Sequence, residues 1–375
     1  MINQFVVATE IILYICFALL MGSLVLQAIP KTSKPFIYFP NNTRIAVVIL
    51  IPVLSFFPLL EIGTILGGDV GLFVALKSVI LTFEIGKAWM FTTLTSLVLL
   101  LYLLFNDLEK KPSAVWNAFI LTSFLIFSAG YAGHASSITK WVGFLSHSFH
   151  FLAVVVWAGV VLIVAWFSKD ATNWSKFLKI FSPLALICMF ILIIAGLITM
   201  AIDINSYDDP NASIVDEYKN GLVVNYGLTL LLKHIIFIPL LVFAFINSIV
   251  LRNRLNENAS YLPIKWIRAE SIFILLVLIV TAFLELDYPP HQVDLLVKST
   301  GYSPLLQAIN SGQPPLPIKV DLVFEIKQYL LLLCSLIAAW LMVYSARKKE
   351  SPLVSIVFGV VFIVTSFIAI VSAVQ

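Results

Sequence analysis

The chain has 375 residues, of which 61% are hydrophobic and only 11% are charged. A soluble domain carries roughly a quarter charged residues, so this composition excludes an ordinary soluble protein and indicates an integral membrane protein. The formal net charge of +3 is too small, and its basic residues are too scattered, for a nucleic-acid partner.

Ten apolar runs of about 20 residues, separated by polar segments, are long enough to cross a bilayer as helices. They lie at 5–28, 44–64, 85–105, 114–131, 144–167, 177–202, 226–251, 266–286, 327–346 and 352–373. We therefore predict an all-α, polytopic membrane helix bundle. A shorter run at 70–83 has Lys77 in its middle, and we interpret it as a re-entrant or interfacial helix outside the ten.

The distribution of charge predicts the orientation. If residue 1 faces outward, 15 of the 23 basic residues fall in loops on the inner side. They are Lys31, Lys34, Arg44, Lys110, Lys111, Lys169, Lys176, Lys179, Arg252, Arg254, Lys265, Arg268, Arg347, Lys348 and Lys349. The positive-inside rule then places both termini outside the cytoplasm.

Acidic residues concentrate on the opposite, outer loops. They include Asp203, Asp208, Asp209, Asp216, Glu217, Glu285, Asp287, Asp294, Asp321 and Glu325. Such a surface attracts cations, although solvation of the loops alone also explains it.

All five histidines fall in the outer half under this orientation. His134 ends the fourth predicted helix, and His147 and His150 open the fifth, three residues apart and so on one helical face. His150 is about 9 Å and His234 about 12 Å below the start of its own helix, so the two are expected at one depth. Intramembrane ionisable residues are usually functional; hydrogen-bonded interfacial histidines are the alternative, which we favour for His291.

A series of segments follows in order along the chain: “GHA” at 133–135, “HFLAVVVWAG” at 150–159, “FSPLALICMFILIIAGL” at 181–197, “YGLTLLLKHIIFIPLLVFAFIN” at 226–247 and “IRAESIFILLVLIVTAFLELDYPP” at 267–290. This series resembles the copper resistance protein D family of bacterial membrane proteins, and “LTFEIGKAW” at 81–89 is similar to that family's segment before its third helix. The resemblance covers 1–291, so we expect a transport core of eight helices there and an added outer loop with two helices at 292–375.

The resemblance implies movement of copper ions across the bacterial plasma membrane, inward, with His134 and His150 as metal residues. Helix geometry adds His147 and His234 to this set. Imidazole and sulfur ligands suit Cu(I), so Met200, or Met90, is expected to complete the site. The sequence contains no soluble copper-binding segment like those fused to some relatives, so a separate extracytoplasmic donor protein is the expected partner.

Cysteines do not point to another kind of site. Cys16, Cys188 and Cys334 fall singly within predicted helices, without the CxxC spacing of a zinc or disulfide framework. We interpret them as small buried hydrophobic residues, with a Cu(I) relay as the alternative.

No nucleotide-binding motif is present, and we expect a channel or carrier, not an enzyme or an ATP-driven pump. Two further hypotheses stay open. His150 and His234 at matched depth suit bis-histidine ligation of haem b, with Lys233 near a propionate. The second hypothesis is a copper sensor or assembly factor that does not transport copper.

Overall fold

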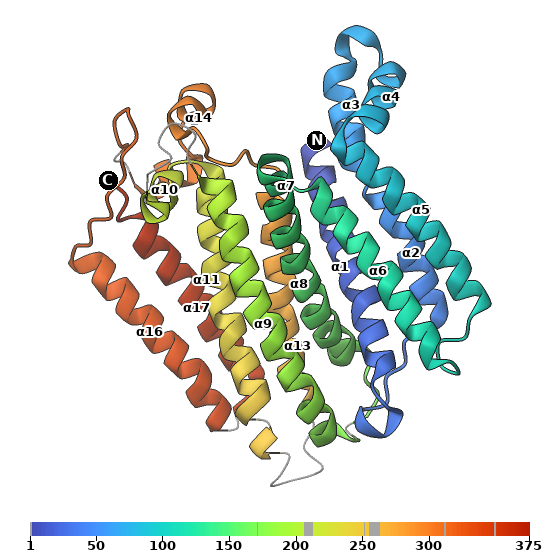
Figure 1. Cartoon of the computed structure of the whole chain (residues 1–375). Helices are drawn as coiled ribbons and strands as arrows, with labels where there is room; N and C mark the ends of the chain where they lie inside the picture. The colour runs from blue at the N-terminus through green and yellow to red at the C-terminus, as the bar shows by residue number, and fades with distance from the viewer. Residues whose placement is uncertain are drawn as a thin grey trace. The chain divides into compact units, whose positions relative to one another are not determined.

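The computed structural model describes residues 2–170, 172–205, 213–250, 252–254, 263–310, 313–348 and 350–375. Within these ranges the chain is helical and has no β-strand (Figure 1). Asp208, Asp209 and Lys349, which entered the charge analysis, lie outside the described residues.

Ten helices in the described part are long and apolar enough to cross a membrane, which confirms the predicted all-α, polytopic class. They are α1 (Ile2–Ala28), α2 (Asn41–Leu54) continued by α3 (Phe57–Val70), α5 (Glu84–Phe105), α6 (Pro112–Ala132), α8 (Trp141–Phe167), α9 (Trp174–Ile204), α11 (Asn225–Phe245), α13 (Ile264–Leu284), α16 (Ile326–Arg347) and α17 (Pro352–Val371).

The chain forms two compact units. The first contains Met1–Ile202 with Ser260–Ile264, and the second contains Asp203–Ala259 with Lys265–Gln375. In the second unit, α17 packs against both α16 and α11. The two added helices therefore belong to the same compact unit as α11, and the division at residue 291 stays a prediction about which part of the chain is family-like.

Helix α8 is the buried centre of the first unit. Its side chains from Val155 to Ala165 are all buried, and α1 crosses it at a pair of glycines. A Cβ on Gly159 would lie 1.9 Å from the carbonyl oxygen of Ala18, and a Cβ on Gly22 would lie 2.2 Å from the carbonyl carbon of Gly159. Small residues at such a crossing let two membrane helices approach closely, which fixes α8 against α1.

The apolar run at 70–83 forms a hairpin arm with α3. Its helix, α4 (Leu72–Thr82), is too short to count as a span and is joined to α3 at Gly71, whose φ of +85° favours glycine. Figure 1 shows α3 and α4 side by side at the end of the first unit where the chain begins. Its interfacial or re-entrant character stays a prediction.

Three basic loops meet at the opposite end of the first unit. Lys31 pairs with Glu109 at 3.0 Å, and the backbone N–H of Phe36 donates to Asp170 at 3.0 Å. Burial, together with the nearby cations Lys31 and Arg44, lowers the pKa of Lys34 to about 8. The loops after α1, α5 and α8 therefore share one side, as the alternation of spans predicts.

Replacing Gly159 by alanine tests the crossing. The new Cβ would meet the backbone of α1, which cannot move as a side chain can, so we expect Gly159→Ala to lower the free energy of unfolding by about 1–3 kcal/mol or more. Thermal unfolding in detergent measures the change. Gly68→Ala is the matched control, because nothing lies within 4 Å of a Cβ there. Equal midpoints for the two variants would contradict the account.

Candidate functional site

His150 of α8 contacts the backbone of α9. It lies nine residues after Trp141, about 14 Å along the helix. This depth exceeds the predicted depth of about 9 Å because α8 begins three residues earlier than predicted. Its Nδ1 is 3.0 Å from the carbonyl oxygen of Leu192. A carbonyl oxygen can only accept, so Nδ1 carries the proton and donates it. This tautomer leaves the lone pair on Nε2, the atom through which such a histidine binds a metal.

Gly196 makes room for this imidazole. A Cβ at Gly196 would lie 2.9 Å from both Cε1 and Nδ1 of His150. Leu192, Gly196 and Met200 are spaced by four residues and therefore share one face of α9. The half-buried Met200 thus lies one turn beyond the glycine that His150 contacts, and its thioether is a soft donor on that face.

The His147 imidazole lies against a different residue, Gly133. A Cβ on Gly133, where α6 ends, would lie 2.1 Å from its Nδ1. His134 follows Gly133 directly and begins the short helix α7 (His134–Thr139), where its side chain is exposed. His134 and His147 therefore lie at the same end of the first unit, around Gly133, whereas His150 contacts α9.

His234 belongs to the second unit. It lies nine residues after Asn225, again about 14 Å along its helix. Its Nδ1 is 2.9 Å from the hydroxyl of Tyr218 in α10 (Ile214–Gly221). Burial raises the pKa of that hydroxyl above its usual value, which keeps its proton in place. The meeting of His234 with His150 stays a prediction, because the two residues lie in different units.

In the part of the chain that the structure describes, no three His, Cys, Asp or Glu side chains form a metal-binding group. His291 is buried, and its Nδ1 is 2.9 Å from the Asn205 carbonyl, which fits the hydrogen-bonded role favoured for it. The three cysteines are free, as predicted. Cys16 and Cys188 are buried, but Cys334 is exposed on α16, so the prediction that all three are buried is wrong for Cys334.

Sequence reasoning missed the neighbours that orient the imidazoles. The Leu192 carbonyl carries no sequence signal, since every residue has one. Gly196 does carry a signal, because an isolated glycine within an apolar helix often marks a close approach. Tyr218 could not be paired with His234 before the turn between α10 and α11 was known.

Fold and site define a polytopic helical membrane protein with partly buried, oriented histidines in its spans. Residues 175–284 match the family Copper resistance protein D. The matched residues run from the start of α9 to the end of α13 and include Leu192, Gly196, Met200 and His234, whereas His134, His147 and His150 precede them. No curated protein and no solved structure matches the chain.

Gly196→Ala tests the orientation of His150. The Cβ would displace the imidazole, a side chain that can yield, so we expect a folded protein with an altered His150. Loss of an orienting partner typically weakens metal affinity by about 10–100-fold, and we expect Cu(I) affinity to fall within this range. Competition with a chromophoric Cu(I) chelator measures it, with Gly68→Ala as the control. Unchanged affinity in Gly196→Ala would contradict the proposed orientation.

Proposed function

We propose that this protein conducts copper ions across the bacterial plasma membrane into the cell, without ATP and without catalysing a reaction. The observation that carries the proposal is the Nδ1 contact of His150 with the Leu192 carbonyl, because a histidine protonated at Nδ1 binds a metal through Nε2. The match of 175–284 to a copper family supports copper as the metal.

The proposed metal residues are His134, His147, His150, His234 and Met200. Nitrogen and thioether sulfur are ligands for soft Cu(I), while hard oxygen ligands suit other ions. His147 and His134, around Gly133, are proposed to receive the ion at the outer end, and His150 with Met200 to hold it deeper. His234 of α11, in the second unit, is proposed as a further copper ligand.

The proposed orientation has both termini outside the cytoplasm. It rests on the basic loops, three of which meet at one end of the first unit. An inside-negative potential then favours uptake of a cation by about 2.3 kcal/mol per charge per 100 mV. A separate extracytoplasmic protein is proposed as the copper donor.

Metal content of the purified protein tests the site. We expect about one copper per chain, no Soret band, and loss of the copper in His150→Ala, because that variant removes the Nε2 ligand. His291→Ala is the matched control, since His291 is a histidine outside the proposed set. Copper retained in His150→Ala would remove that residue from the site, and a Soret band without copper would favour the bis-histidine haem hypothesis.

Flux measurements test the direction and the driving force. In proteoliposomes oriented with both termini outside, we expect Cu(I) uptake to rise when a potassium diffusion potential makes the lumen negative. The rise should be absent in liposomes that contain His150→Ala. Uptake that is insensitive to the potential, or movement only outward, would contradict the proposal.

A further inference from the structure

The end of α16 carries an exposed aromatic pair. Trp340 and Tyr344 are four residues apart, and their rings stack with centroids 4.9 Å apart at an interplanar angle of 22°. Trp340 is 60% exposed and Tyr344 is 43% exposed, on a helix that is apolar enough to cross a membrane. Tryptophan and tyrosine gather where the hydrocarbon of a bilayer meets the lipid headgroups. The pair indicates that the last two turns of α16 lie at this boundary.

Two cations follow the rings on the same side of the helix. The Nζ of Lys348 lies 5.7 Å from the centroid of the Tyr344 ring, and Lys348 is exposed. Arg347, three residues after Tyr344, is exposed at a neighbouring position of the helix surface. Toward the middle of the span, Leu333 and Leu336 are exposed apolar side chains. One side of α16 thus presents apolar side chains, then two stacked rings and then two cations.

Two of the last carbonyl groups of α16 already have donors within the chain. Basic side chains at a helix C-terminus commonly bond to such carbonyl groups. Here the buried Arg254 donates to the carbonyl of Ala346, and the N–H of Lys348 donates to the carbonyl of Tyr344 at 2.9 Å. No salt bridge joins Arg347 or Lys348 to another described residue. Both cations are therefore available to an anion from outside the chain.

This end of the second unit has an excess of positive charge. Arg254 joins the residues after α11 to the end of α16, and Asn247 donates to the Trp266 carbonyl at 3.4 Å, which brings the start of α13 to the same end. The basic residues described here are Arg252, Arg254, Lys265, Arg268, Arg347 and Lys348, and the acidic residues are the buried Glu270 and the exposed Glu350. Such an excess attracts an anionic headgroup.

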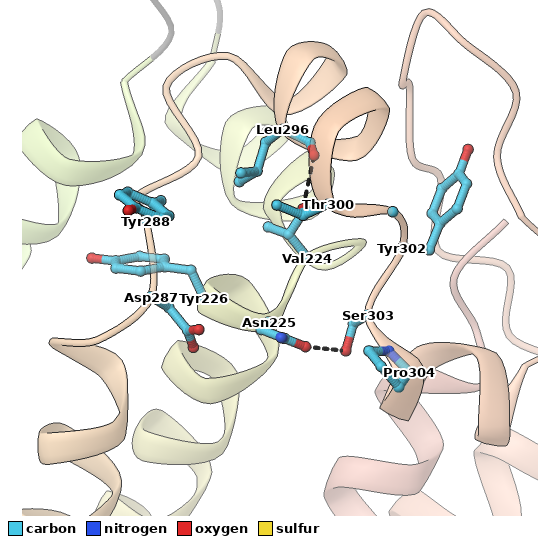
Figure 2. A pocket seen from close by; sticks show the side chains of 11 residues that line it. Val224, Asn225, Tyr226, Asp287, Tyr288, Leu296, Thr300, Tyr302, Ser303 and Pro304 are labelled. Carbon is cyan, nitrogen blue, oxygen red and sulfur yellow. Dashed lines mark hydrogen bonds between the residues drawn. The ribbon is translucent and has the colours of Figure 1, made fainter. Parts of the chain in front are cut away.

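The opposite end of the second unit carries carboxylates. Glu325 caps the start of α16, which Figure 1 shows at the same end as the start of α11. The pocket there lies between α11 and the helices α14 (Val293–Thr300) and α15 (Pro304–Ile309), and Asp287 is the only charged residue among the described residues that line it (Figure 2). Lys327 is exposed at this end, two residues after Glu325. It therefore serves as a comparison for the two cations at the other end of the same helix.

We propose that the end of α16 binds the headgroup of an anionic phospholipid, with Arg347 and Lys348 on its phosphate and an acyl chain along Leu333. Clusters of lysine and arginine beside a membrane span bind anionic headgroups. The Trp340–Tyr344 pair would lie between the phosphate and the acyl chain, at the level that these rings prefer. This inference shares no residue with the proposed copper site and does not depend on copper transport or its direction.

Thermal unfolding with added lipid tests the proposal on the full-length protein in a neutral detergent. A ligand that binds only the folded state raises the unfolding midpoint. We expect phosphatidylglycerol to raise the midpoint of the wild type, and phosphatidylcholine to raise it less. The phosphatidylglycerol concentration that gives half of the gain should rise roughly fivefold for each cation removed, and about 25-fold when Arg347→Gln and Lys348→Gln are combined.

Lys327→Gln is the matched control, because it removes one exposed lysine from the other end of the same helix. It should respond to phosphatidylglycerol as the wild type does. Native mass spectrometry supplies a second readout, in which the wild type should retain bound phosphatidylglycerol and the double variant should lose it. Equal gains from the two lipids, an equal gain from inorganic phosphate alone, or the same loss in Lys327→Gln as in Lys348→Gln would each overturn the proposal. A dimer in detergent that Trp340→Ala converts to monomers would also overturn it, since a second copy would then cover this side of α16.

Discussion

Lipid offers a spanning segment no hydrogen-bond partner, so each span must satisfy its own backbone as a helix. This constraint produces the ten apolar helices and also makes each polar group within them conspicuous. The carbonyl oxygen of Leu192, which lies within α9, accepts from the His150 imidazole, and the hydroxyl of Tyr218 partners His234. His150 and His234 therefore have hydrogen-bond partners within the fold, and for His150 the carbonyl partner determines that Nδ1 carries the proton.

Glycine positions set the distances on which this arrangement depends. Gly22 and Gly159 bring α1 against α8 and so place the helix that carries His147 and His150. Gly133 and Gly196 then leave space for the two imidazoles themselves. Glycines thus form both the helix crossing and the spaces that the two imidazoles occupy. Small residues commonly allow such close packing between membrane helices.

The helices could be predicted from the sequence because hydrophobic length determines them almost alone. Trp141 rather than residue 144 begins α8, and the added residues Trp141, Val142 and Gly143 are apolar and extend the run. The histidines could be named from their residue type, but not their partners: His147 and His150 are three residues apart and still contact different helices. Backbone atoms such as the Leu192 carbonyl, and pairings such as Tyr218 with His234, depend on the fold and have no counterpart in a residue pattern.

X-ray absorption at the copper edge tests the central claim, that His150 binds the metal through Nε2 while Nδ1 donates to the Leu192 carbonyl. The account predicts imidazole nitrogen scattering with a sulfur contribution in the wild type. The copper signal, and with it the imidazole scattering, should be lost in His150→Ala, and the sulfur signal should fall in Met200→Leu. Imidazole scattering that is the same in the wild type and in His150→Ala would contradict the account.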